Sequence, residues 1–150
     1  DRRGFVRGYS QPNNPKTAAQ GNVRQVMLAT QRGIGVTGAT TKTSVKALAP
    51  TDYRWNSYLV QQNIGTNSVR WDASLAAFNA LAAAEQTAWD DEATALNIEE
   101  TSLPYAGDPA ISPGATLFAY ARTLFRLGLY AATGAPDGTN ATAWAADIIS

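Results

Sequence analysis

The side chains in this sequence that could carry out chemistry are mainly carboxylates. The densest run, Asp-Asp-Glu at 90–92, falls in a predicted helix, and a second group joins Glu99 and Glu100 to Asp108. Successive helical residues point about 100° apart, so three adjacent acids cannot converge on one ion or bond. The run indicates a solvated or partner-facing acidic surface. The second group has carboxylates suited to Ca²⁺ but lacks the regular spacing of an EF-hand.

Other motifs with chemical meaning lack the context that they need. The glycines at 33, 35 and 38 match GxGxxG, but they follow a predicted helix instead of a strand, which argues against a dinucleotide site. The triplet 140–142 is a glycosylation sequon, relevant only in an exported chain. The chain has no cysteine and no histidine, which removes disulfides, thiolate and imidazole metal sites and the usual nucleophiles and bases. We therefore expect no enzyme, no catalytic residue, no cofactor and no metal ligand.

The charged residues are divided between the two parts of the chain. Residues 1–70 contain ten basic and two acidic residues, a net charge of +8, and residues 71–150 contain two basic and ten acidic residues, a net charge of −8. Basic surfaces bind nucleic acid or anionic surfaces. The ten basic residues are, however, spread without a dense cluster. Nucleic-acid binding is thus kept as an alternative function, and a hydrolase that uses carboxylates as a weaker one.

Length and composition favour one domain. A chain of 150 residues can bury a substantial core. No apolar run approaches 18 residues, so we expect no membrane span. Only 16% of residues are charged, against about 25% in typical domains, as in subunits covered by neighbours or in a secreted monomer. The chain begins at Asp1 instead of Met, which fits either a removed leader or numbering that starts inside the gene product.

Residues 1–14 are predicted to form an extended N-terminal arm, followed by a single helical domain at 15–150. The arm has no helical period, and Phe5, Val6 and Tyr9 give it apolar anchors beside Arg7. Two interpretations remain open: a frayed terminus, or an arm that lies on its own or a neighbouring subunit.

A central helical hairpin, rich in Trp and Leu, is predicted over 68–81 and 84–97. Apolar residues recur there at steps of three and four, which builds one buried face on each helix. Trp89 is expected in the core. Glu85 lies in the first turn of the second helix, where it suits the helix dipole.

Caps and apolar spacing predict the remaining elements. A first helix runs from Pro15 to Arg32 and stops at Gly33 and Gly35. Residues 33–50 are predicted to form a long Gly/Thr loop with a possible short β-hairpin. A second helix runs from 50 or 51 to 63, closed by Gly65. Ser112 opens a helix that ends at Gly134, and 141–149 form a short closing helix.

The second helix contains Tyr53, Arg54, Trp55 and Tyr58. Tyr, Trp and Arg are enriched at the centres of protein interfaces. A core helix in an aromatic-rich domain is an equally good interpretation of the same residues.

Three segments carry a resemblance to a known group of proteins: GFVRGYSQPNNPKTAAQGNVR, AEQTAW ahead of an acidic helix, and ISPGATLFAYARTLFRLG. Together they resemble a loosely defined family of small helical proteins encoded among the structural genes of tailed phages and prophages. The matching positions are Pro15, Thr17, Gln20, Arg24, Leu81, Glu85, Ala88, Trp89, Gly114 and Phe118. The chain departs from the pattern by an insertion at 33–70 and by Ala82 and Ala83 in place of a Ser or Thr cap. The resemblance implies a structural role in a particle or filament and no chemistry.

The sequence thus predicts an all-α fold of about five helices and a structural self-assembly subunit. It would belong to a virion, as a decoration, tail or neck protein, or to an extracellular filament on a cell surface. The expected partners are copies of itself and other virion or filament proteins. The predicted assembly interface comprises Phe5, Val6, Arg7, Tyr9, Tyr53, Arg54, Trp55, Tyr58, Asp90 and Asp91.

Overall fold

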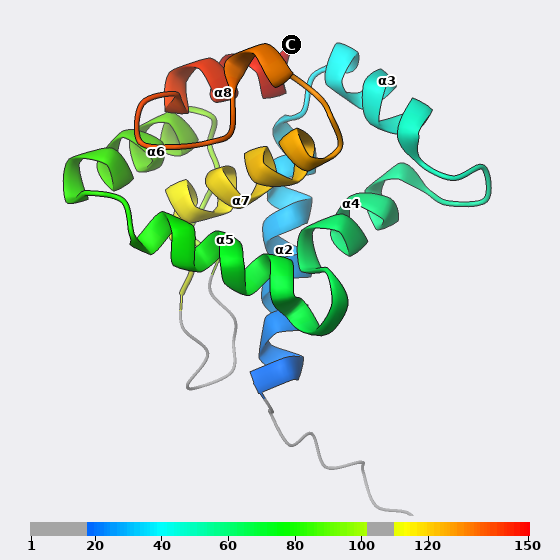
Figure 1. The fold of residues 1–150 in the computed structure, drawn as a ribbon, viewed down its shortest axis with the longest axis horizontal. Coiled ribbons are helices and arrows are strands. Elements are labelled where there is room, and N and C mark those ends of the chain that lie inside the picture. The colour runs from blue at the N-terminus through cyan, green and yellow to red at the C-terminus, as the bar shows by residue number, and fades with distance from the viewer. Residues whose placement is uncertain (1–17, 102–109) are drawn as a thin grey trace, which may run out of the picture.

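The computed structural model describes residues 18–101 and 110–150. This part of the chain contains seven α-helices, two short 3₁₀ turns and no β-strand, so the predicted all-α class is confirmed (Figure 1). The helices are α2 (Ala18–Val36), α3 (Ala39–Leu48), α4 (Trp55–Ile64), α5 (Val69–Asn79), α6 (Ala83–Ala95), α7 (Pro113–Arg126) and α8 (Ala141–Ile149). The predicted arm at 1–14 lies outside the described residues.

Helix α7 is the central element, and the other helices surround it in Figure 1. It begins as predicted, because Ser112 Oγ accepts the N–H of Ala115 at 3.1 Å and Pro113 occupies the first position. Ten of its residues, all between Gly114 and Leu124, are buried. A helix buried on nearly all sides forms the middle of a core. The predicted end at Gly134 is wrong, because α7 stops at Arg126.

The two helices of the predicted hairpin exist as α5 and α6, but they pack chiefly on α7 and not on each other. Trp89 is fully buried, as expected, and its ring meets that of Phe118 edge-on at a centroid distance of 5.1 Å. The indole N–H of Trp89 donates to the carbonyl of Asp137 at 2.7 Å. Phe78 of α5 reaches the same Phe118 ring at 5.6 Å. Helices α5 and α6 therefore each contribute a wall of the core, and α7 its centre.

Helix α2 runs through both glycines that were predicted to end it. Gly33 faces the ring of Tyr120, and a Cβ at position 33 would lie 2.5 Å from Cδ1 of that ring. Here glycine allows two helices to approach closely instead of ending one of them. The helix stops at Val36, after which Thr37 hydrogen-bonds to the Tyr120 hydroxyl at 2.7 Å.

The predicted Gly/Thr loop with a β-hairpin at 33–50 is also wrong, because most of it is helix α3. The hydroxyls of Thr43 and Ser44 donate to backbone carbonyls four residues earlier, so these polar residues are satisfied within a helix. The first turn of α3 is completed by the end of α8: the N–H of Gly38 donates to the carbonyl of Ile148, and those of Thr40 and Thr41 donate to that of Ser150. Such partners from far along the chain leave no local sequence signal.

Helix α4 begins at Trp55, later than predicted, and ends at Gly65 as expected. Near its end the side chain of Asn63 is buried and fully engaged. Its amide donates to Thr30 Oγ1 at 3.0 Å, and its amide oxygen accepts from Thr123 Oγ1 at 3.1 Å. This polar contact joins α2, α4 and α7 and fixes their relative positions.

Helix α8 has the bounds that the sequence predicts, with Trp144 and Ile148 buried. The indole N–H of Trp144 donates to the carbonyl of Gly134 at 3.0 Å, and its ring is met edge-on by Phe125 and Tyr130. The C-terminal segment is therefore part of the core.

Candidate functional site

The ten residues of the predicted assembly interface are divided among three places. Phe5, Val6, Arg7 and Tyr9 lie outside the described residues. Tyr53, Arg54, Trp55 and Tyr58 lie at the connection between α3 and α4. Asp90 and Asp91 lie on α6.

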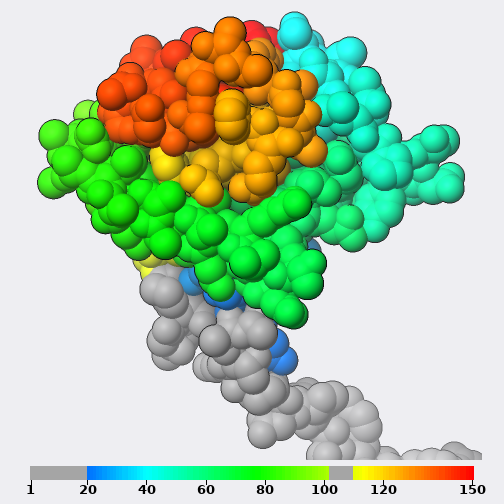
Figure 2. Space-filling model, in the orientation of Figure 1, coloured from blue at the N-terminus to red at the C-terminus, as the bar shows by residue number. Residues whose placement is uncertain are grey.

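The α3–α4 projection, residues 46–58, stands out from the body of the molecule (Figures 1 and 2). Tyr53 is 43% exposed, Arg54 is exposed, and Trp55 and Tyr58 are half-buried. The main core contact of α4 is made by Leu59, which is fully buried, and Trp55 packs partly against the same core. Tyr53 and Arg54 are therefore surface residues, whereas Trp55 is shared between the surface and the core.

A shallow hollow of about 380 Å³ lies on this projection. Its lining residues are Lys46, Ala49, Pro50, Thr51, Tyr53, Arg54, Trp55 and Asn56. The ammonium of Lys46 is 6.0 Å from the centre of the Trp55 ring. The hydroxyl of Tyr53 accepts a hydrogen bond from the Gln61 amide at 2.8 Å, which holds the phenol in place. The projection thus presents ordered aromatic and cationic groups around a concave surface.

The acidic run on α6 is mostly turned toward its own fold. Asp90 Oδ1 accepts the N–H of Gly114 at 2.7 Å, and Glu92 Oε1 accepts the hydroxyl of Thr142 at 2.6 Å. These two carboxylates meet the N-terminal turns of α7 and α8, where the helix dipole favours negative charge. Only Asp91 is exposed. The predicted solvated or partner-facing acidic surface is therefore wrong for Asp90 and holds at Asp91.

Glu85 replaces the missing Ser or Thr cap of α6. Its carboxylate accepts the backbone N–H of Ala82 at 3.0 Å, which is half of a capping box. Alanine at position 82 cannot return a side-chain hydrogen bond. The helix nevertheless begins one residue from its predicted start.

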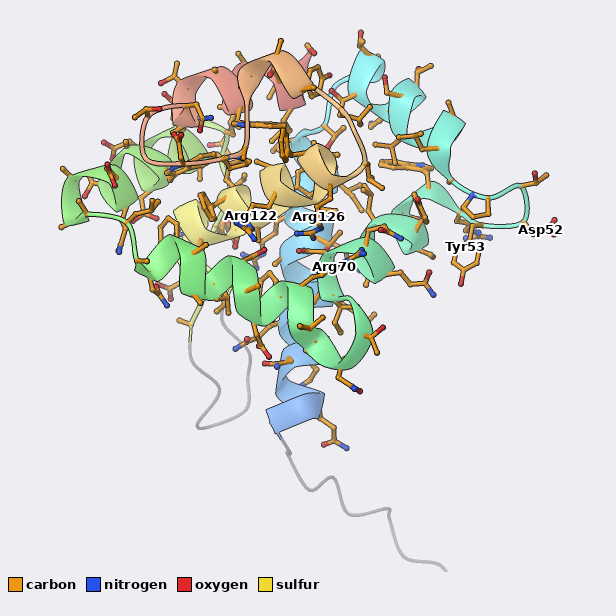
Figure 3. All side chains as sticks on the ribbon, viewed as in Figure 1. Asp52, Tyr53, Arg70, Arg122 and Arg126 are labelled. Atoms are coloured by element: carbon orange, nitrogen blue, oxygen red, sulfur yellow. The ribbon has the colours of Figure 1, made fainter. Side chains whose placement is uncertain are left out.

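Sequence reasoning missed a cluster of three cations, the arginine triad, formed by Arg70 of α5 and by Arg122 and Arg126 of α7. Figure 3 shows the three side chains close together between α7 and the α4–α5 connection. The carbonyl oxygen of Gln62 accepts from both Arg70 Nη1 at 3.3 Å and Arg126 Nη2 at 3.1 Å. Two guanidinium groups therefore share one acceptor in the last turn of α4, where unpaired carbonyls attract cations.

The third member of the triad is held differently. Arg122 Nε donates to Ser74 Oγ at 3.1 Å, and its guanidinium lies 5.9 Å from the centre of the Phe118 ring. Within the described part of the chain, none of the three arginines forms an ion pair with a carboxylate.

Burial lowers the pKa values of two members of the triad, and repulsion from neighbouring arginines lowers one of them further. Partial burial, followed by the charges of Arg70 and Arg122, lowers the pKa of Arg126 to about 10. Burial also lowers the pKa of Arg122. Because the pKa of Arg126 still lies well above 7, its guanidinium stays protonated at neutral pH. The triad is thus a concentrated positive charge that no carboxylate of residues 18–101 and 110–150 pairs with.

An unusual backbone places Arg70 in this cluster. Gly65, Asn67 and Ser68 have φ values of 67°, 53° and 62°, and the two residues that are not glycine adopt this conformation at a cost. The turn lays the aliphatic part of Arg70 against Gly65, where a Cβ would lie 2.7 Å from Arg70 Cγ. Backbone strain that holds like charges together is a reason to seek a function for them.

A hollow of about 560 Å³ adjoins the triad at this connection. It is lined by Gln61, Gln62, Ile64, Gly65, Thr66, Val69 and Arg70. The sequence does contain one signal for the triad. Arg122 and Arg126 are the only basic residues after Trp71, and they are four apart on a helix, where like charges repel.

The fold and these surfaces define an all-helical domain with an aromatic projection and a cationic cluster. Over residues 18–101 and 110–150, no three or more carboxylates gather closely enough to hold a metal ion. No helix in those ranges combines the length and apolarity that a membrane crossing requires. The chain matches no model of a known protein family, no curated protein and no solved structure.

Proposed function

We propose that this protein is a structural self-assembly subunit of a virion or of an extracellular filament. The observation that carries the proposal is the α3–α4 projection. It carries Tyr53, Arg54 and Trp55 on a protruding part of the surface, where they line a hollow that the described residues leave open. Aromatic and arginine side chains of this kind supply most of the binding energy at protein interfaces.

Exposed apolar side chains on the projection and on one further surface support contacts between copies. On the projection, Leu48 is 43% exposed, as Tyr53 is. On α2, Val23 and Met27 are 44% and 46% exposed and lie four residues apart, on one face of the helix. Clustered apolar exposure favours an interaction surface over random exposure, which is scattered.

The resemblance to small helical phage and prophage structural proteins agrees with this proposal. The segment that departs from that family, 33–70, includes α3, α4 and the projection between them. A decoration, tail or neck protein would use such an addition to contact its neighbours. The first part of the chain, with Phe5, Val6 and Tyr9, is proposed to act as a second contact, docking on a neighbouring subunit.

The test compares two surface variants with the wild type by multi-angle light scattering and negative-stain electron microscopy. The double variant Tyr53→Ser/Arg54→Ser removes exposed side chains from the projection, so it should fold normally and fail to assemble. The control is Ile149→Ser, which shortens a 49% exposed side chain at the end of α8, away from the proposed contacts, and should assemble like the wild type. Wild-type protein that stays monomeric, or a double variant that assembles normally, would contradict the proposal.

A further inference from the structure

Several N–H groups of the arginine triad make no hydrogen bond within the described residues. A guanidinium carries five N–H groups in a planar fork. Arg70 uses Nη1, Arg126 uses Nη2 and Arg122 uses Nε, and in the described residues their other guanidinium nitrogens make no hydrogen bond. Both terminal nitrogens of Arg122 are therefore open to a ligand. Forked donors of this kind suit a planar carboxylate.

The chain also carries a pair of carboxylates that has no partner. Glu99 and Glu100 are exposed, and neither side chain forms an ion pair or hydrogen bond within the described residues. Their backbone is nevertheless held firmly, because Arg32 Nη1 donates to the carbonyl of Glu99 at 2.9 Å and to that of Glu100 at 2.8 Å.

The residues on either side of the pair are anchored in the core. Ile98 is 4% exposed and Thr101 is fully buried. Thr101 also exchanges two backbone hydrogen bonds of 2.8 Å with Ile111. The acidic pair is therefore presented on ordered backbone, so binding it costs little conformational entropy.

We infer that the arginine triad of one copy binds the Glu99–Glu100 pair of a second copy. The contact joins two different surfaces, so each copy offers one donor surface and one acceptor surface. Such a heterologous contact continues into a ring or a filament. This inference rests on the proposed function and names one of its contacts.

Charge complementarity favours a second copy over nucleic acid as the occupant. The whole chain has twelve basic and twelve acidic side chains, a formal net charge of zero, so its overall charge gives a polyanion no long-range attraction. A single acidic pair needs only the local positive charge, and this chain supplies one such pair for each triad.

Within one copy, the arginine triad and the Glu99–Glu100 pair lie in different places and form no ion pair with each other. The chain after α6, which carries the acidic pair, passes behind α7 in Figure 1. The triad lies between α7 and the α4–α5 connection in Figure 3. A copy therefore keeps both surfaces open for neighbours.

Two double variants test the contact by sedimentation velocity. Arg122→Gln/Arg126→Gln removes two members of the triad and keeps the acidic pair, whereas Glu99→Gln/Glu100→Gln does the reverse. Each variant alone should need at least about tenfold more protein to assemble than the wild type. Mixed together, they should associate at a concentration at which neither associates alone, because the intact triad of one variant can then meet the intact acidic pair of the other.

The Glu99→Gln/Glu100→Gln variant should fold like the wild type, because neither carboxylate makes a hydrogen bond or ion pair within the described residues. Its loss of assembly therefore cannot be attributed to misfolding. If both variants assemble like the wild type, the triad contact is wrong and assembly through the α3–α4 projection still stands. If neither the wild type nor the mixture associates, the contact and the proposed function both fail. Binding of a short single-stranded oligonucleotide at about 0.15 M NaCl, lost only in the arginine variant while assembly is unchanged, would make nucleic acid the occupant and overturn the inference.

Discussion

Gly33 and Gly35 show that one residue type can have two roles in the same helix. Both were predicted to end α2, and both lie inside it. At position 33 an added Cβ would lie 2.5 Å from the Tyr120 ring, whereas at position 35 nothing lies within 4 Å. The first glycine is required by packing on α7. The second is only a weak point in a helix.

Alanine substitutions should therefore have opposite effects at these two positions. Gly33→Ala forces two packed helices apart and should lower the free energy of unfolding by about 1–3 kcal/mol. Gly35→Ala removes a flexible residue from a helix interior and should raise it by about 0.5–1 kcal/mol. Urea denaturation monitored by circular dichroism measures both. Equal effects of the two substitutions would contradict the contact between Gly33 and Tyr120.

Tyr120 also gives the fold a measurable dependence on alkaline pH. Burial raises the pKa of its hydroxyl to about 12, against a small opposing effect of the hydrogen bond from Thr37. The unfolded chain loses this proton near pH 10. The stability that the protonated phenol contributes is therefore present below pH 10 and is lost as the pH rises from 10 to 12.

Tyr120→Phe tests this dependence. Between pH 10 and 12, the free energy of unfolding of the wild type should fall by about 2–3 kcal/mol more than that of the variant. The lowered pKa of Arg126 acts in the opposite direction in the same range, but it does so in both proteins and cancels in the comparison. Parallel pH profiles of the two proteins would show that Tyr120 titrates normally.

At the scale of elements, local signals predicted α8 and the starts of α6 and α7. Ser112 and Pro113 act within one turn of α7, so sequence alone is sufficient there. Helix α3 could not be predicted in this way, because the partners of its first turn are Ile148 and Ser150, more than a hundred residues further along the chain. The same limit applies to Asp90, since only the fold shows that α6 meets the start of α7.

The role of Asp90 predicts a difference between adjacent acidic residues. Asp90→Ala removes the carboxylate that accepts from Gly114 at the start of α7 and should cost about 1–2 kcal/mol of stability. Asp91→Ala changes an exposed side chain and should cost less than about 0.5 kcal/mol. Thermal unfolding at pH 7 compares the two variants. A larger loss for Asp91 would mean that the helix faces are assigned incorrectly.

At the scale of the whole molecule, the two oppositely charged halves of the sequence do not predict where charge acts. The arginine triad takes two of its three members from the acidic half, and two acids of the densest run accept hydrogen bonds within the fold. The sequence identified the aromatic part of the candidate interface, Tyr53 to Tyr58, from composition. It missed the triad because Arg70 lies some fifty residues from its two neighbours.

Assembly should therefore depend on salt. The screening length falls from about 10 Å at 0.1 M to about 3 Å at 1 M, which weakens partly exposed charge pairs between copies. Light scattering of the wild type from about 0.05 to 1 M NaCl should show slower assembly as salt rises. The Glu99→Gln/Glu100→Gln variant should show a smaller dependence. Identical salt profiles would remove charge as a determinant of the contact.

The distribution of the four tryptophans gives the protein its own optical probe. Trp71, Trp89 and Trp144 are fully inaccessible to solvent, whereas Trp55 on the α3–α4 projection is only partly buried. Acrylamide should therefore quench one indole of the native monomer, with an emission to the red of the other three. If copies cover the projection, that quenching disappears while the blue emission of the core is unchanged. The binding of one copy to the next can thus be followed in solution without attaching a dye.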